Sequence, residues 1–201
     1  MPRITAERRA QRREQIVEAA IRSVMRSGFQ GMTMAQVIEE SGLSAGAVYG
    51  YFASKDDLLV AVADARIGDM DAILRYVLDA PEPVHPAFAI QMLVDQLADL
   101  SRHPDGDLTV VVVQIWGQAV LGGEVHAILA PRIQGVLTTL THLVRRWRDA
   151  GRLPADADPH AMARVLLSML PGYLLQRLVV GDIAPNDYAQ GLRDLMAGGS
   201  E

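Results

Sequence analysis

Helical periodicity runs through almost the whole chain and limits it to an all-α fold. Residues 6–27 contain neither Gly nor Pro, and Ile16, Ala20 and Val24 recur at the spacing of one helix face. The only strong β-branched run, Val110–Val113, has no second strand candidate with which to complete a sheet, so we assign it to a buried helix. The sequence therefore predicts helices throughout, separated by breaks that contain Gly or Pro.

The expected helix ends follow from local signals. Gly28 has the position of a left-handed helix terminus, and Thr33 with Gln36 has the spacing of a capping box. Pro131 and Pro171 lie inside long helical patterns, where a proline removes a backbone donor, so we expect each to kink or break its helix. The predicted helices are 6–27, 34–40, 47–52, 55–78, 87–101, 107–121, 124–150, 159–180 and 186–196.

Composition excludes several classes of protein. The 201 residues include no Cys, which removes disulfides, thiolate metal sites and a Cys nucleophile. The longest stretch without charge, residues 108–123, is shorter than the ~20 apolar residues of a membrane span. The N-terminal run is charged and lacks the apolar core of a secretory signal. We expect a cytoplasmic protein with no membrane partner.

No pattern of residues predicts catalysis. The five His are dispersed without the pairing typical of zinc sites, and paired acids fall at helix starts or in loops. There is no Gly-rich loop of the kind that binds phosphates. We therefore expect no enzyme activity, no metal and no cofactor.

Charge is distributed unevenly along the chain. The net charge is −5, yet residues 1–55 hold eight Lys/Arg and five Asp/Glu, whereas residues 56–201 hold eleven and nineteen. A basic head on an acidic body is expected if the N-terminal end meets phosphates, although a solvated helix face would look the same.

The two short helices predicted at 34–40 and 47–52 are joined by a Gly-containing turn and form a helix-turn-helix, in which the second helix enters the major groove of DNA. Thr33, Tyr49 and Lys55 can donate hydrogen bonds to phosphates, while the small residues before Val48 let the backbone approach base edges. The predicted DNA-binding residues are Thr33, Ser44, Ala45, Gly46, Ala47, Tyr49, Gly50, Tyr51 and Lys55, with Arg3, Arg8 and Arg9 in an N-terminal arm.

These residues resemble the N-terminal domain of TetR/AcrR-family repressors, which typically show T-x-x-x-I-A-x-x-x-G-x-S-x-G-x-x-Y-x-Y-F-x-x-K-x-x-L. The chain matches this pattern at Thr33, Val37, Gly42, Ser44, Gly46, Tyr49, Tyr51, Phe52, Lys55 and Leu58. Ala45 and Gly50 depart from the residues common in that family, and residues 47–52 hold no Arg, Lys, Asn or Gln. We therefore expect only modest direct reading of bases.

The resemblance implies that the C-terminal body binds a small molecule and dimerises through its last two helices. Polar and aromatic groups scattered among apolar helices could line a pocket, particularly beside a break at Pro171-Gly172. The candidate ligand-binding residues are Trp116, Tyr173, Gln176, Met169, Gln114 and His142. The candidate dimer residues are Val165, Leu166, Met169, Leu178, Leu192, Leu195 and Met196.

The sequence thus predicts a helix-turn-helix domain at residues 1–54 and a helical ligand-binding and dimerisation domain at 55–201. The expected function is a homodimeric transcriptional regulator, a repressor released from a palindromic operator by a small apolar or amphipathic effector. Two alternatives stay open. One is a helical small-molecule carrier or enzyme whose basic N-terminus is incidental, and the other is a DNA-binding protein without an effector.

Overall fold

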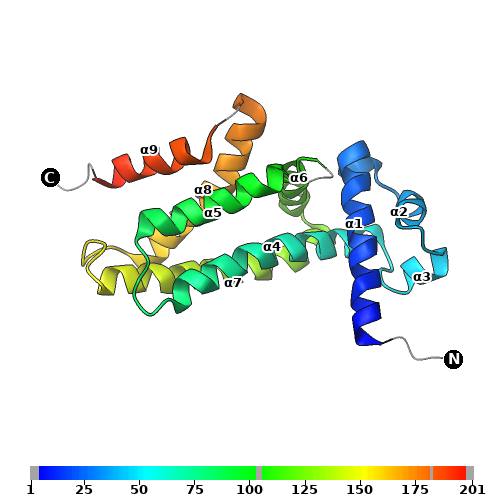
Figure 1. The fold of residues 1–201 in the computed structure, drawn as a ribbon, viewed down its shortest axis with the longest axis horizontal. Helices are drawn as coiled ribbons and strands as arrows, with labels where there is room; N and C mark the ends of the chain where they lie inside the picture. The colour runs from blue at the N-terminus through cyan, green and yellow to red at the C-terminus, as the bar shows by residue number, and fades with distance from the viewer. Residues whose placement is uncertain (1–4, 103–105, 182, 198–201) are drawn as a thin grey trace. The chain divides into compact units, whose positions relative to one another are not determined.

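The computed structural model describes residues 5–102, 106–181 and 183–197. Within these ranges every multi-residue element of secondary structure is a helix (Figure 1). The all-α prediction is confirmed. The run Val110–Val113 lies inside helix α6 (Thr109–Val120), as expected from its lack of a strand partner.

The chain forms two compact units. The first comprises Met1–Arg66 with His103–Leu129, and the second comprises Ile67–Arg102 with Ala130–Glu201. The predicted domain boundary follows residue 54, whereas the first unit also contains α6, because α6 packs against α1 (Ala6–Gly31). The functional boundary at residues 54 and 55 stays a prediction.

The first unit is built on α1, which packs along α2 (Met34–Ser41), and α2 in turn contacts α3 (Ala45–Tyr49) (Figure 1). The first part of α4 (Lys55–Asp79) and the start of α7 (Gly123–Asp149) complete it. The apolar core of this unit includes Ile16, Ala20, Val24, Val37 and Val48, each at most 1% exposed. Ile38 and Leu43 are partly buried.

The helix ends of the first unit follow side-chain chemistry. Thr33 and Gln36 form the predicted capping box at the start of α2. At α3 the prediction was wrong by two residues, because Ser44 is itself the cap: its Oγ accepts from the backbone N–H of Ala47 at 3.3 Å, so the helix begins at Ala45. The segment 50–52, expected to be helical, forms a turn after Tyr49.

Gly28 marks a sharp change of direction within α1. Its backbone has φ 69° and ψ 170°, and its carbonyl accepts from the N–H of Met32 at 3.1 Å. The helix therefore leaves regular geometry one residue after the predicted end, and a short terminal turn leads from Gly28 to the cap at Thr33. The side chain of Phe29 lies outside the described part.

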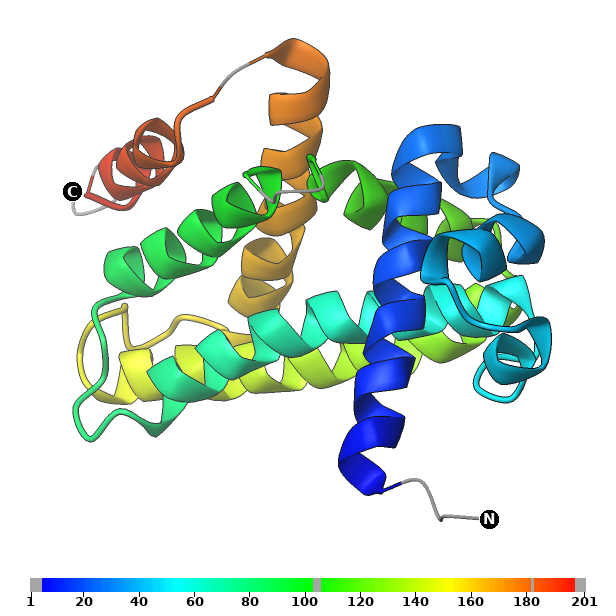
Figure 2. The same ribbon diagram turned by 45° about the vertical axis from the view of Figure 1, so that its right-hand side comes forward.

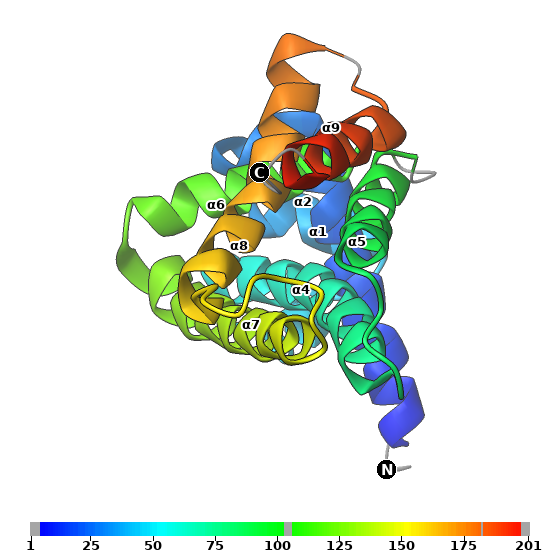
Figure 3. The ribbon, with the colours of Figure 1, turned by 90° about the vertical axis from the view of Figure 1, so that its left-hand side faces the viewer.

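The second unit contains the rest of α4 and α7 together with α5 (Pro86–Ser101), α8 (Pro159–Leu175), a π-helix, η1 (Gln176–Val180), and α9 (Pro185–Ala197). Helix α5 contacts both α8 and α9, as Figures 2 and 3 show from two sides. Its core includes Leu74, Leu140, Val144, Trp147 and Ala163, each at most 2% exposed.

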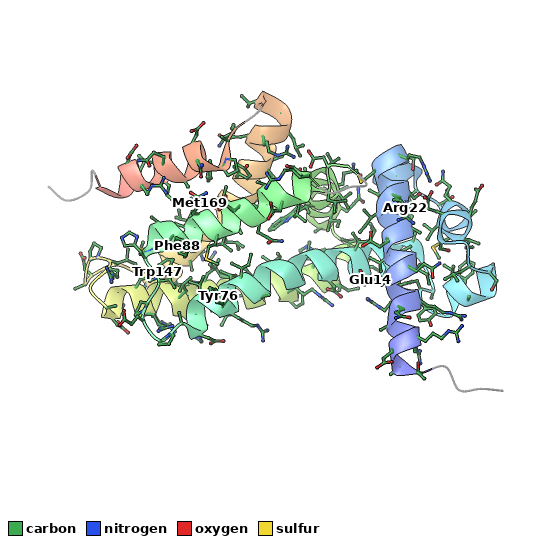
Figure 4. The ribbon with its side chains drawn as sticks, in the orientation of Figure 1. Glu14, Arg22, Tyr76, Phe88, Trp147 and Met169 are labelled. Atoms are coloured by element: carbon green, nitrogen blue, oxygen red, sulfur yellow. The ribbon has the colours of Figure 1, made fainter. Side chains whose placement is uncertain are left out.

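Two side chains at the end of α7 hold the α4–α5 connection. Trp147, labelled in Figure 4, donates its indole N–H to the carbonyl of Val84 at 2.7 Å. Arg146 donates to the carbonyls of Leu78 and Ala80, the latter at 2.8 Å. Since a buried carbonyl without a partner is costly, these bonds fix where α4 ends and α5 begins.

Neither proline breaks its helix, so the expected breaks are absent, and the expected kinks stay predictions. α7 continues through Pro131, and α8 continues through Pro171 to Leu175. A proline removes one backbone donor and leaves the rest of the ladder intact. In α8 the burial of Tyr173 and Leu174, at most 1% exposed, stabilises the helix directly after the proline. The departure from regular geometry comes later, in the π-helix.

Candidate nucleic-acid interface and dimer surface

Exposed small and polar residues gather at the start of α2 and around α3. Thr33, Ser44, Ala45, Gly46 and Gly50 are exposed. Tyr49 is 51% exposed, and Ala47, Tyr51 and Lys55 are partly buried. Because little side-chain bulk covers the backbone here, this face can approach a groove of DNA closely, which is the geometry that the helix-turn-helix prediction requires.

The hydroxyls of Thr33 and Ser44 act first as helix caps. Thr33 Oγ1 accepts from the N–H of Gln36 at 3.2 Å, and Gln36 Oε1 accepts from the N–H of Thr33 at 2.8 Å. These bonds orient the first turns of α2 and α3, where unpaired N–H groups favour anions such as phosphate. The role of Thr33 as a phosphate donor stays a prediction.

Lys55, at the start of α4, contacts the terminal turn of α1 beside this face. Its Nζ donates to the carbonyl of Gln30 at 3.2 Å, so the lysine bridges to the terminal turn of α1. At the same helix start, Asp57 accepts from the N–H groups of Ala53 and Ser54 at 3.0 and 3.2 Å. A lysine held in this way has a defined position beside the candidate interface.

The N-terminal arginines pack on aromatic rings of the turn after α3. The guanidinium of Arg9 lies 5.9 Å from the ring centroid of Tyr51, and that of Arg13 lies 5.4 Å from the centroid of Phe52. Such cation–π contacts orient the arm of α1 against the turn. Arg8 and Arg9 are exposed, whereas Arg3 lies outside the described residues. Arg13 was not among the predicted residues, although its four-residue spacing from Arg9 signals a shared face.

Two further basic residues of α1 share one acidic partner within the unit. Glu40 of α2 accepts from Arg22 at 3.0 Å and from Arg26 at 2.5 Å (Arg22 is labelled in Figure 4). Hydrogen bonds from Arg26 and Arg22 hold the pKa of Glu40 below its ordinary value. The basic surplus of the N-terminal segment is therefore concentrated toward the first turns of α1, away from this pair.

The six candidate effector residues are divided between the two units. Gln114 and Trp116 are partly buried in α6 of the first unit, and Gln114 Oε1 lies 3.9 Å from where a Cβ on Gly28 would stand. In the second unit, Tyr173 is fully buried, Met169 is partly buried, and His142 and Gln176 are exposed.

The hydroxyls of two tyrosines, Tyr173 and Tyr188, link α8 to the residues that follow it in the chain. The hydroxyl of Tyr173 donates to the carbonyl of Ile183 at 3.4 Å, and the Tyr173 ring meets that of Tyr188 edge-on at 5.2 Å between centroids. Tyr188 donates to the carbonyl of Met169 at 3.2 Å, and burial raises the pKa of Tyr188. These bonds connect α8 to α9, so Tyr173 has a structural role in the second unit. The helix break that we expected beside it is absent, and its effector contact stays a prediction.

Apolar side chains lie exposed on the last helices. Val165 is 60% exposed and Leu195 is 79% exposed, whereas Leu166, Met169, Leu178 and Leu192 are partly buried. The side chain of Met196 lies outside the described part. The predictions missed three further exposed apolar residues, which are Leu175 at the end of α8 and Val179 and Val180 in the π-helix.

The same segment is long and apolar enough for a membrane span by composition alone. An 18-residue window within Pro159–Val180 has a mean hydropathy of 1.2, and only 17% of that window is buried within one chain. A helix this apolar and this poorly covered needs further contacts to bury its surface.

Among the described residues, no three His, Asp or Glu gather in a way that could hold a metal ion.

Both the N-terminal and the C-terminal part of the chain match models of known protein families. Residues 16–62 match the model of "Bacterial regulatory proteins, tetR family", and residues 86–198 match "BetI-type transcriptional repressor, C-terminal". The chain belongs to the TetR family of bacterial transcriptional regulators, with a C-terminal part of the BetI type. The resemblance inferred from the helix-turn-helix residues is thereby confirmed.

Individual relatives agree with this assignment. The chain is 27% identical over 177 residues to the uncharacterized HTH-type transcriptional regulator YfiR of Bacillus subtilis, covering 88% of this chain and 85% of that one. It is 28% identical over 171 residues to the HTH-type transcriptional regulator BetI of Stenotrophomonas maltophilia, covering 85% and 83%.

Solved structures share the fold. Salmonella enterica GusR superposes with a TM-score of 0.74 at 21% identity, covering 98% of both chains. The regulator FadR from Bacillus subtilis, solved in complex with stearoyl-CoA, superposes with a TM-score of 0.77 at 13% identity, covering 94% of this chain and 99% of that chain.

Proposed function

We propose that the chain is a cytoplasmic repressor that binds a palindromic DNA operator as a homodimer and leaves it when a small apolar or amphipathic effector binds. The observation that carries the proposal is the exposed, capped face of α2 and α3, flanked by the basic first turns of α1. Phosphate contacts from Tyr49, Lys55 and the arm would position this face in the major groove. The proposal assigns the chain no catalytic step.

The dimer would form through α8, η1 and α9. Their exposed apolar side chains, such as Val165, Val179 and Leu195, gain burial if two copies pack symmetrically. Two-fold symmetry of the protein requires two half-sites in the operator. Leu192→Arg would place an unpaired charge in the contact and should give monomers in sedimentation. A variant that sediments as an intact dimer would exclude this surface.

The effector would bind the C-terminal part, where Tyr173 and Gln176 of the second unit are our candidates for its contacts. An amphipathic effector class agrees with the acyl-CoA bound by the FadR structure named above. Trp116, in α6 of the first unit, is a separate candidate. Trp116→Ala should alter the response to the effector and keep effector-free DNA binding, because Trp116 is not among the residues of α2 and α3 that form the reading face. A normal response by a normally folded Trp116→Ala variant would remove Trp116 from the site.

The direct test is binding of the full chain to duplex fragments from the region flanking its own gene, measured by fluorescence anisotropy over a range of salt concentrations. The proposal predicts tight, salt-dependent binding to one fragment with a palindrome, and release by an effector screened from acyl-CoAs and other amphipathic molecules. A carrier or enzyme with an incidental basic segment would show no salt-dependent duplex binding. A regulator without an effector would bind the operator and be released by none of them.

A further inference from the structure

A polar groove lies between α7 and the first turn of α8, within the second unit. It has a volume of about 200 Å³ and is lined by Gln134, Leu137, Thr138, Thr141, His142, Arg145 and His160. Drug-sized ligands occupy pockets of about 300–1,000 Å³ that are mostly apolar. This groove is smaller and more polar than such pockets, and the effector role predicted for His142 stays a prediction.

The ionisable side chains that line the groove are all basic. His142 and Arg145 come from α7 and His160 comes from α8, whereas no Asp or Glu lines the groove. Arg164, one turn further along α8, donates to Nε2 of His160 at 3.3 Å and adds a second guanidinium beside it. The nearby acid, Asp158, accepts from the backbone N–H of His160 at 2.9 Å as the helix cap. A chain with a net charge of −5 thus concentrates basic groups at one small concavity.

The lining groups divide into those already bonded and those available to a ligand. The hydroxyls of Thr138 and Thr141 donate to carbonyls of their own helix, those of Gln134 and Leu137, at 2.9 and 2.7 Å. Arg145 is exposed, and the structure gives it no ion pair with any described residue. A guanidinium with a planar fork of donors, next to two imidazoles, matches the geometry of an oxyanion.

We propose that this groove binds a small oxyanion, the phosphate or carboxylate group of a metabolite, with Arg145 as its main ligand and His142 and His160 beside it. The site is separate from the DNA-binding face and from the apolar effector, so its failure leaves the proposed function intact. Phosphate and carboxylate share the required chemistry, which is two or more acceptor oxygens on a compact anion.

The test is titration of the full-length chain with sulfate, inorganic phosphate and succinate at constant ionic strength, followed through the ring protons of His142 and His160 by NMR. We expect saturable shifts with a Kd of about 1 mM or tighter for at least one anion. A preference for phosphate over succinate would assign the site to phosphorylated ligands, and the reverse preference to carboxylates.

Two variants with the same change of charge make the test specific. Arg145→Gln removes the proposed ligand, whereas Arg152→Gln removes an exposed arginine that does not line the groove. Loss of a charge-assisted hydrogen bond should weaken anion binding about tenfold or more in Arg145→Gln, with Arg152→Gln close to the parent chain. Equal weakening of anion binding in both variants would overturn the proposal. The absence of a saturable shift with any anion would also overturn it, as expected if a second copy of the chain covers the groove.

Discussion

Replacing Gly28 by alanine should destabilise the protein, although it adds only one methyl group. Gly28 has φ 69° and ψ 170°, a region that is essentially restricted to glycine. There is space for the methyl group itself, because the first atom that an added Cβ would meet, Oε1 of Gln114, is 3.9 Å away. The cost is therefore backbone strain of about 1–3 kcal/mol and not a steric clash.

Gly117 provides a matched control with the opposite expected sign. It lies in helix α6, it is exposed, and an added Cβ would meet no atom within 4 Å. Alanine loses less backbone entropy than glycine in a helix, so Gly117→Ala should stabilise the protein by about 0.5–1 kcal/mol. Comparing glycine-to-alanine substitutions at these two positions thus separates the effect of backbone conformation on stability from the effect of adding a methyl group.

Thermal unfolding followed by far-UV circular dichroism measures both variants. For a chain of this size, 1 kcal/mol corresponds to a shift of about 2–4 °C in Tm. We expect a lower Tm for Gly28→Ala and a slightly higher one for Gly117→Ala. A Gly28→Ala protein that melts with or above the parent chain would show that α1 runs straight through this position.

Three further perturbations test other contacts. The pKa of Glu40 in the folded protein is lowered below the ordinary glutamate value of about 4.3, so the stability from its bonds to Arg22 and Arg26 should be lost as the pH falls through that lowered pKa. Urea denaturation at several pH values measures this dependence, and Glu40→Gln should flatten it. Trp147→Phe should cost about 1–3 kcal/mol in the same assay because the carbonyl of Val84 loses its donor; a cost below 0.5 kcal/mol, about the usual surface value, would contradict that role. Removing residues 1–9 should make the slope of log affinity for DNA against log salt shallower by up to ~0.9 per lost phosphate contact, and an unchanged slope would show that the arm makes none.

Features that depend on neighbouring residues could be predicted from the sequence. The capping box of Thr33 and Gln36 depends on a few adjacent positions and is present. Gly28 has the positive φ expected of a left-handed helix terminus, but its ψ of 170° lies outside the left-handed helical region, so that part of the prediction was wrong. The start of α3 was misplaced because Ser44 was interpreted as part of a connection, although its hydroxyl provides the cap.

Features that depend on distant residues could not be predicted in the same way. Glu40 lies 18 and 14 positions from Arg22 and Arg26, so no local spacing reveals that it pairs with both. The neighbour of Gln114 is also distant in sequence, because its Oε1 lies near Gly28, and its effector contact stays a prediction. The continuity of α8 through Pro171 likewise depends on burial of Tyr173, which the local pattern does not report.

The central claim is that the exposed face of α2 and α3 binds the phosphates of duplex DNA. Two exposed tyrosines test it most directly: Tyr49 on α3 is 51% exposed, and Tyr76, on the part of α4 in the second unit, is 66% exposed (Figure 4). The measurement is the affinity of Tyr49→Phe and Tyr76→Phe for operator and random duplexes by fluorescence anisotropy. We predict that Tyr49→Phe weakens binding to both duplexes about tenfold, through loss of one hydrogen bond to a charged group, while Tyr76→Phe matches the parent chain. Unchanged affinity of Tyr49→Phe, or an equal loss in both variants, would contradict the account.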